Sequence, residues 1–245
     1  MILKVLGSSS KGNCYLLTNG KESLIIEAGI NIKEVKKALY FNLRSVQGCL
    51  ITHEHGDHSK YAQKFLDSGI NLYSSKGTFE ALGLSHHRLK TVIKNKIYKI
   101  GGFDIVPFGV NHDCNDPLGY LIRHKDLGIL LFATDTYYLN NQFPGVNHIL
   151  IECNYSLPIL ESNVENELLH FKQKERVIKS HFGLDNVKEF LKVNDLSRTY
   201  NIVLLHLSDR NSNEEEFIKD ISSLVNIQTY AAKEGLKIEL LDGPF

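Results

Sequence analysis

The sequence predicts an α/β fold, an αββα sandwich in which two mixed β-sheets are flanked by helices. Short apolar segments with the length of β-strands alternate with amphipathic helical segments along the whole chain. The chain contains no internal repeat, low-complexity tract or linker. We therefore expect residues 1–245 to form a single domain.

The first part of the chain starts with three predicted strands and a helix. The strands cover residues 2–6, 14–18 and 24–27 and are joined by Gly-bearing turns. Asn31 is expected to cap the helix, and Glu34 to close a capping box. The elements expected next are a strand at 48–52, a helix at 60–67, a strand at 70–73 and a short helix at 78–82.

The rest of the chain continues the alternation. The middle is rich in strands, which are expected at 97–100, 103–110, 118–123, 129–133 and 149–152. Residues 156–179 show a helical, amphipathic pattern, and Asp185 is expected to cap a helix that ends at residue 191. The last predicted elements are a strand at 202–207, a helix at 214–225 and strands at 228–230 and 236–241.

Composition limits the location and the partners of the protein. The start MILKVLGSSS lacks the pattern of a signal peptide, and no apolar run has the length of a membrane span. We therefore expect a cytoplasmic protein with no membrane partner. The 28 basic residues balance 28 acidic residues, so a long nucleic acid is not the favoured partner, although the balance leaves a local basic patch open.

The segment from His53 to His58, His-Glu-His-Gly-Asp-His, carries the strongest chemical signal. His53 and His55 are two residues apart, so on an extended segment they point the same way. Asp57 and His58 are adjacent and diverge at the start of a helix, so they can serve a second metal ion. Gly56 is expected to permit the tight backbone that this crowding requires. The motif predicts a metal site.

Three further candidate ligands, His112, Asp135 and His206, lie at the ends of predicted strands. Each of them alone is more commonly a surface group. Together with the motif they give two coordination sets: His53, His55 and His112 with Asp135, and Asp57, His58 and His206 with Asp135. Imidazole nitrogens and carboxylate oxygens suit two divalent ions, Zn²⁺ in the first place, with Mn²⁺ or Fe as other occupants.

These motifs resemble those of the metallo-β-lactamase superfamily over nearly the whole chain. The matching segments are THEHGDH, NHD at 111–113, TDT at 134–136 and HLSDRN at 206–211. The opening GSSSKGN at 7–13 is similar to a branch of small bacterial and phage hydrolases that includes the WalJ (YycJ) nucleases. The resemblance implies the metallo-β-lactamase sandwich and a dinuclear metal hydrolase.

The resemblance also implies a catalytic role for His181, and the chemistry of a site with two metal ions predicts one for Asp57. In tRNase Z and cyclic-nucleotide phosphodiesterase relatives, a histidine upstream of the last ligand lies over the reacting phosphate, and His181 occupies that place here. A protonated His181 would stabilise the phosphorane or protonate the leaving oxygen, while Asp57 orients the attacking hydroxide. The alternative for His181 is a surface histidine at the end of a helix.

Structural and functional roles compete for two further features. The loop at 7–13 lacks the Gly-Lys-Ser/Thr ending of a nucleotide-binding loop, so a tight turn near the metal site is favoured over a substrate contact. Tyr137, Tyr138 and Tyr155 lie beside predicted strand ends of the site. Packing in the core or in a dimer is favoured for them over stacking on a base.

Several substrate classes of the superfamily are disfavoured. A secreted β-lactamase would need a signal peptide, and a tRNase Z a long Gly/Pro-rich arm, neither of which the sequence shows. A β-CASP nuclease needs a large insertion, for which the stretch between Asp135 and His206 leaves no room. Two classes remain: a WalJ-like exonuclease acting on DNA or RNA ends, and a phosphodiesterase for small cyclic nucleotides.

The favoured prediction is the cyclic-nucleotide phosphodiesterase. The chain has CNYS at 153–156 where the WalJ pattern has Asn-His-Asp, and SHFG at 180–183 where it has a Gly-His-Leu-Ser type of sequence. The segments at 174–181, 194–197 and 206–211 resemble phage members, including the anti-Pycsar proteins. Those proteins destroy cyclic CMP and cyclic UMP and work as homodimers.

We therefore expect a homodimeric enzyme of phage immune evasion, acting in the host cytoplasm. It would hydrolyse 3′,5′-cyclic CMP and UMP, with cyclic AMP and GMP as further substrates, to linear nucleoside monophosphates. The exonuclease is the alternative enzyme, and a metal-bound scaffold without activity is an alternative of another class.

Overall fold

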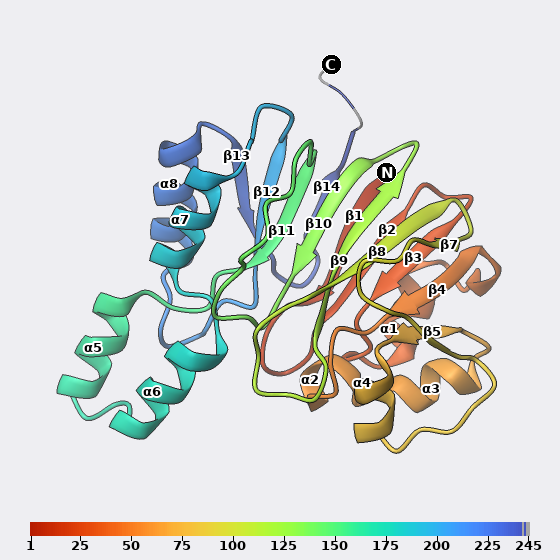
Figure 1. Cartoon of the computed structure of the whole chain (residues 1–245), viewed down its shortest axis with the longest axis horizontal. Coiled ribbons are helices and arrows are strands. Elements are labelled where there is room, and N and C mark those ends of the chain that lie inside the picture. The colour runs from red at the N-terminus through yellow and green to blue at the C-terminus, as the bar shows by residue number, and fades with distance from the viewer. Residues whose placement is uncertain (242, 244–245) are drawn as a thin grey trace. The chain divides into compact units, whose positions relative to one another are not determined.

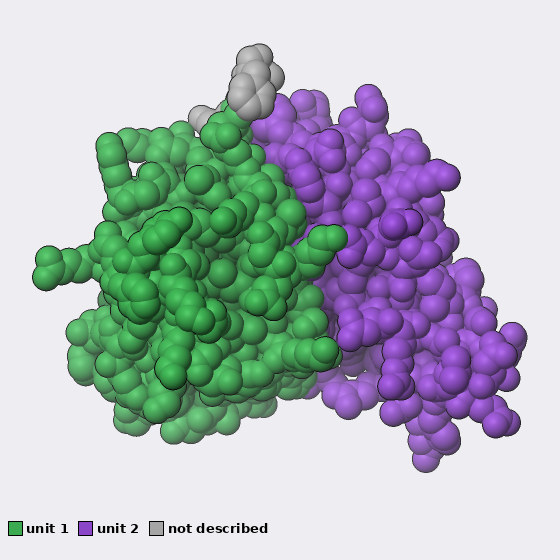
Figure 2. Space-filling view, turned by 180° about the vertical axis from the view of Figure 1, so that it is seen from behind, with its two compact units in different colours: residues 1–109, 114–129, 233–245 green, residues 110–113, 130–232 purple. Residues whose placement is uncertain are grey.

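The structure is a computed structural model that describes residues 1–241 and 243. It divides into two compact units, which Figure 2 colours separately. Unit 1 consists of residues 1–109, 114–129 and the described residues from 233 onward, and unit 2 of residues 110–113 and 130–232. The single domain expected for residues 1–245 stays a prediction, and each unit is described by itself.

A seven-stranded sheet forms the centre of unit 1, with the strand order β14-β1-β2-β3-β4-β5-β6 (Figure 1). Its strands are β1 (Ile2–Gly7), β2 (Cys14–Thr18), β3 (Ser23–Ile26), β4 (Val46–Leu50), β5 (Leu72–Ser74), β6 (Leu89–Thr91) and β14 (Lys237–Glu239). The pairs from β14 to β3 are antiparallel, and those from β3 to β6 are parallel. The chain therefore leaves β3, β4, β5 and β6 at the same edge of the sheet.

The helices that accompany this sheet are α1 (Ile32–Ala38), η1 (Leu43–Ser45), α2 (Gly56–Ser59), α3 (Ala62–Asp67) and α4 (Lys76–Ala81). All of them except α2 contribute to one apolar cluster with the sheet. Val35 of α1 and Phe65 of α3 are fully buried in the same cluster as Leu16 and Ile25 of the sheet. Burial of these side chains supplies the main driving force for folding of this unit. Unit 1 also contains the antiparallel strands β7 (Tyr98–Ile100), β8 (Phe103–Gly109) and β9 (Leu118–His124).

Unit 2 is built on parallel strands. They are β10 (Gly128–Ala133), whose first two residues belong to unit 1, β11 (His148–Glu152), β12 (Asn201–Leu205) and β13 (Gln228–Ala231). Every residue of β11 is buried, as expected for a central strand of a covered sheet. The helices are α5 (Leu157–Glu165), α6 (Phe171–Ser180), α7 (Leu184–Val193) and α8 (Glu214–Val225), of which α8 contacts both α7 and β13.

The predicted α/β class, with two mixed sheets flanked by helices, is confirmed. Several local predictions were wrong. The side chain of Asn31 caps α1 by accepting the Lys33 N–H, but Glu34 forms an ion pair with Lys37 (2.9 Å) where a capping box was predicted. The N-cap of α7 is Gly183, so Asp185 lies in the first turn of that helix.

Element boundaries also differ from the predictions. The helical stretch at 156–179 is two helices, because the chain turns at Glu167, which has a φ of 59°. Strand β12 ends at Leu205, before His206, and the strand β6 was not predicted. In the described part of the chain, no helix combines the length and the apolar character that crossing a bilayer requires.

Candidate metal and catalytic site

Unit 1 gathers the predicted ligands of the His53–His58 motif. The motif follows β4, and α2 starts within it at Gly56. The ring centroid of His53 lies 4.7 Å from that of His55 and 4.2 Å from that of His58. Both His53 and His58 are buried. The short helix places Asp57 and His58 in its first turn, as the divergence of the two adjacent residues had predicted.

A buried carboxylate, Glu27, holds two of these rings in place. Its Oε1 accepts the hydroxyl hydrogen of Thr52 (2.5 Å), and Thr52 Oγ1 lies 2.9 Å from His53 Nδ1. The same Glu27 oxygen lies 3.4 Å from His58 Nδ1. Outer contacts of this kind fix the orientation of metal-binding imidazoles. Glu27 was not among the predicted site residues, although it is a carboxylate at the end of an apolar strand.

The loop at 7–13 packs against the end of the motif through Asn13. The Asn13 backbone N–H donates to the Asp57 carbonyl oxygen (2.7 Å). Its side-chain amide lies 3.2 Å from Asp57 Oδ2 and 3.1 Å from His58 Nε2. The structure thus places this loop as a turn that supports Asp57 and His58.

The glycine that this crowding requires is Gly29. A Cβ at Gly29 would lie 1.7 Å from the carbonyl oxygen of Asp57. A Cβ at Gly56 would meet no atom within 4 Å, and Gly56 has no positive φ. The predicted role of Gly56 was therefore wrong, because the close approach is made by the segment after β3 and not by the motif itself.

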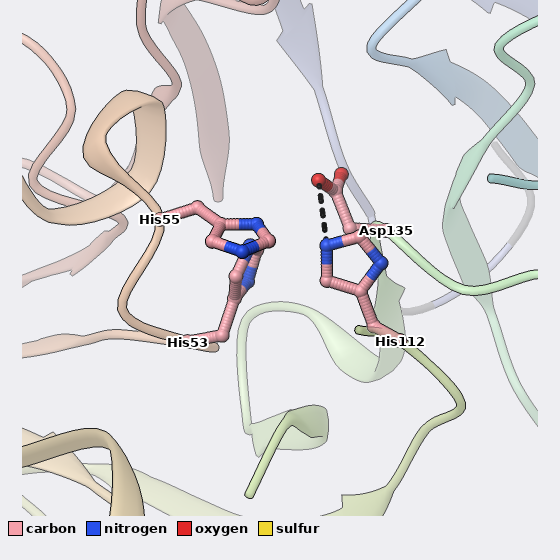
Figure 3. A group of neighbouring side chains, drawn as sticks. All are labelled: His53, His55, His112 and Asp135. Carbon is pink, nitrogen blue, oxygen red and sulfur yellow. Dashed lines mark ion pairs between the residues drawn. The ribbon is translucent and has the colours of Figure 1, made fainter. Parts of the chain in front are cut away.

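Unit 2 brings together the other three predicted ligands. His112 Nε2 lies 3.6 Å from Asp135 Oδ2, and Asp135 Oδ1 lies 3.1 Å from His206 Nδ1. Figure 3 draws this His112–Asp135 pair together with His53 and His55 of unit 1. The ring of His112 is oriented by its Nδ1–H, which donates to the Ser180 carbonyl oxygen (2.9 Å). Burial lowers the pKa of His112 despite the attraction of Asp135, which favours the neutral imidazole that a metal ion binds.

Glu152 is the centre of the polar network in unit 2. It is fully buried at the end of β11, and its Oε1 lies 2.6 Å from His181 Nδ1 and 3.2 Å from His206 Nδ1. Its Oε2 accepts the backbone N–H groups of Thr136 and Phe182, both at 3.1 Å. Glu152 was not among the predicted site residues either, although it too is a carboxylate at the end of an apolar strand.

The contact between Glu152 and His181 favours an ion pair. Burial alone would lower the pKa of His181, but the Glu152 carboxylate outweighs burial and raises that pKa. In the same way, burial alone would raise the pKa of Glu152, but His181 outweighs it and lowers that pKa. The pair therefore favours the protonated form of His181, which is a partly accessible imidazole at the end of α6 held by a buried carboxylate.

The three tyrosines differ in their burial. Tyr155 is buried against Gly183, and burial raises its pKa to about 12, so it stays neutral. Tyr137 and Tyr138 are 43% and 48% exposed. Core packing is thus excluded for these two residues, which lie on the loop after β10, whereas packing in a dimer and stacking on a base both stay predictions for them.

The donor chemistry of these residues fits divalent metal ions. The chain holds clusters of histidine and aspartate able to bind metal ions, with imidazole nitrogens and carboxylate oxygens as donors. Within unit 2, ligand atoms of Asp135, Glu152, His181 and His206 all lie within 4.8 Å of one another. Because Glu152 and His181 pair with each other, Asp135 and His206 are the donors of this group that suit an ion.

Comparison of the sequence with known proteins identifies a family and two relatives that are similar over most of the chain. The family model described as the metallo-beta-lactamase superfamily matches residues 9–142. The chain is 30% identical over 231 residues to exodeoxyribonuclease WalJ of Streptococcus pneumoniae serotype 2, covering 86% of this chain and 83% of that protein. It is 25% identical over 256 residues to exodeoxyribonuclease YycJ of Bacillus anthracis, covering 97% of this chain and 94% of that protein.

Solved structures share the fold at low sequence identity. Zn²⁺-bound PqqB from Methylobacterium extorquens has a TM-score of 0.76 at 13% identity, with 98% of this chain and 100% of that chain covered. The metallo-β-lactamase fold protein YhfI from Bacillus subtilis has a TM-score of 0.75 at 14% identity, with 97% and 99% covered. At these identities the likeness extends to the fold alone.

Proposed function

The chain belongs to the metallo-β-lactamase superfamily, and from this premise we propose that it is a metal-dependent phosphodiesterase acting on nucleotides. The observation that carries the proposal is the Glu152–His181 pair next to Asp135 and His206. A protonated imidazole held beside metal-binding donors suits a reaction in which a leaving oxygen must gain a proton.

The proposed metal site contains two divalent ions, Zn²⁺ in the first place and Mn²⁺ in the second. The proposed ligands are His53, His55, Asp57, His58, His112, Asp135 and His206. Support comes from the mixed imidazole and carboxylate donors and from the lowered pKa of His112. When bound, such ions lower the pKa of water and polarise phosphoryl oxygens.

The protein side chains have separate tasks in this proposal. Asp57 orients the attacking water, whose oxygen forms the new bond to phosphorus. His181 gives its proton to the oxygen that leaves as the old P–O bond breaks. Glu152 keeps His181 protonated and holds its ring in place, because its buried carboxylate accepts the Nδ1–H (2.6 Å).

Two substrate classes have support from different observations. The zero net charge and the CNYS segment at 153–156 favour 3′,5′-cyclic mononucleotides, cyclic CMP and UMP first. The likeness to two exodeoxyribonucleases over most of the chain favours DNA ends. For the first class we also propose that the protein is a homodimer and serves phage immune evasion. Light scattering tests the oligomeric state, and a monomer would contradict the homodimer.

Product analysis tests the function. Purified protein with Zn²⁺ or Mn²⁺ would be incubated with 3′,5′-cyclic CMP, UMP, AMP and GMP, and separately with single-stranded DNA and RNA. An Asp57→Ala variant would run beside each reaction as a control for contaminating hydrolases.

The outcomes separate the two classes. Linear monophosphates from the cyclic nucleotides, with intact DNA and RNA, support the cyclic-nucleotide phosphodiesterase. Shortened polymers with intact cyclic nucleotides support the exonuclease. Turnover by the Asp57→Ala variant at the rate of the unaltered protein, or no turnover of either class, contradicts the proposed phosphodiesterase.

A further inference from the structure

One segment of unit 1 concentrates positive charge although the whole chain is neutral. Residues 88–99, here called the lysine segment, contain Arg88, Lys90, Lys94, Lys96 and Lys99 and no acidic residue. All four lysines are exposed. This is the local basic patch that the overall charge balance had left open.

The lysine segment passes through β6, and the part of it after Thr91 begins at the same edge of the sheet as the metal-binding motif. Strands β4, β5 and β6 are parallel neighbours, so the chain leaves β6 at the edge where His53 follows β4. Beyond β6, the Val92 N–H donates to the Ser74 carbonyl oxygen (2.8 Å), and the Asn95 N–H donates to the Pro107 carbonyl oxygen (2.8 Å).

Two contacts connect the segment to the motif itself. Lys94 Nζ lies 2.7 Å from Asp116 Oδ1. The backbone N–H of the preceding residue, Asn115, donates to Glu54 Oε1 (2.8 Å), and Glu54 lies between His53 and His55 in the motif. The lysine segment is thus connected to the His53–His58 motif within one unit.

The remaining charge of the segment is available to an anion. Lys94 and Lys99 have acidic partners, Asp116 at 2.7 Å and Asp104 at 3.1 Å. Within the described part of the chain, Lys90 and Lys96 form no ion pair. Between the lysines, Ile93 and Ile97 are 53% and 69% exposed, and the Ile93 N–H donates to the Tyr98 hydroxyl oxygen (2.9 Å).

We propose that the lysine segment binds the phosphate backbone of a single DNA strand and leads its end to the site. A strand offers a row of phosphates to Lys90 and Lys96, and its sugars and bases offer apolar surface to Ile93 and Ile97. A cyclic mononucleotide has a single phosphate and cannot span this segment and the motif. Cleavage of the bound DNA rests on the proposed function. Of the two substrate classes, the lysine segment favours the DNA strand over the cyclic mononucleotide.

The test measures binding apart from turnover. A labelled single-stranded DNA oligonucleotide would be titrated with protein in EDTA, and its fluorescence anisotropy followed at several salt concentrations. We expect the Lys90→Ala/Lys96→Ala variant to bind at least about tenfold more weakly. Its plot of log affinity against log salt should be less steep by about 1.4, because each contact to a single strand contributes about 0.7.

The matched control removes the same charge elsewhere in unit 1. Lys21 and Lys33 are exposed and lie outside the segment. Their double alanine variant should keep the affinity and the salt dependence of the unaltered protein. Lysine on the edge strand β6 also opposes pairing with other chains, and that role alone would leave DNA affinity unchanged.

Three results would overturn the proposal: no DNA binding, equal losses in the two double variants, or equal binding of a poly-glutamate of the same charge. The last would show a general polyanion surface. Hydrolysis of bis(p-nitrophenyl) phosphate by the unaltered protein, measured with metal, tests the proposed function separately. Hydrolysis without lysine-dependent binding refutes only this inference, and binding without hydrolysis refutes only the proposed function.

Discussion

His181 Nδ1 lies 2.6 Å from Oε1 of Glu152, a carboxylate that is fully buried at the end of a central strand. Burial favours the neutral imidazole, but the carboxylate outweighs it and raises the pKa of His181. The acid form therefore persists to higher pH than for a free histidine, and the rate should fall as the pH rises through that pKa.

Substitution of Glu152 tests this coupling. In a Glu152→Gln variant burial is opposed only by the weaker attraction of Asp135, so the alkaline fall of kcat should move to lower pH. A His181→Ala variant should lose about 10²–10⁴ in kcat, the usual range for a general acid. The measurement is the pH–rate profile, with Glu234→Gln as an exposed control. An unchanged profile in Glu152→Gln would show that His181 does not act as the acid.

The outer contact of Glu27 predicts an effect on metal affinity. Glu27 accepts a hydrogen bond from Thr52 and lies 3.4 Å from His58 Nδ1, so a Glu27→Gln variant disturbs the orientation of the metal-binding rings. We expect metal affinity to weaken about 10–100-fold, as for other such contacts. Competition with a chromophoric chelator measures it, with Glu34→Gln on the surface of α1 as the control. Equal affinities in the two variants would contradict the orienting role.

The two glycines near the motif predict opposite effects of alanine. Gly29→Ala places a Cβ against the Asp57 carbonyl oxygen, which should destabilise the fold by roughly 1–3 kcal/mol. Gly56→Ala enters open space at the start of a helix, where alanine is favoured over glycine by up to about 1 kcal/mol. Urea unfolding of both variants measures the free energy of unfolding. A larger loss for Gly56→Ala would contradict the assignment.

A further contact in unit 1 predicts a pH-dependent stability. Glu22 Oε1 lies 2.9 Å from His124 Nε2, and this hydrogen bond, with that of the Gly102 N–H, outweighs burial and lowers the pKa of Glu22. A carboxyl group with a folded pKa below its unfolded value, about 4.3, stabilises the fold above the unfolded value. That contribution is lost as the pH falls through the folded pKa.

The Glu22→Gln variant isolates the contribution of the ionised Glu22 carboxylate to the free energy of unfolding. It should be less stable than the unaltered protein by roughly 1 kcal/mol at neutral pH, and the difference should shrink in acid. Chemical unfolding at several pH values measures it, with the exposed Glu80→Gln as the control. A difference that stays constant from neutral to acidic pH would argue against the ionised hydrogen bond.

Particular residues show which parts of the fold and of the site could be predicted from the sequence. The spacing of His53, His55, Asp57 and His58 is local information, so their clustering could be predicted. Asp135 could be placed at a strand end because β10 is a continuous apolar run. Glu27 and Glu152 could not be identified, since their importance depends on which strands are neighbours, such as β11 between β10 and β12. Strand β6 was missed because it is a short edge strand with an exposed, polar sequence.

Asp135 and His206 both have left-handed backbones, with φ values of 45° and 52°, directly after β10 and β12. Such conformations cost of order 1–3 kcal/mol each for residues other than glycine, and they persist only where the surroundings enforce them. Both residues follow strands that pair in parallel with β11, one on each side of it. Local opening of these strands would let Asp135 and His206 leave their left-handed conformations. Amide hydrogen exchange in β10, β11 and β12 would therefore measure how often the two side chains lose the positions that metal binding requires.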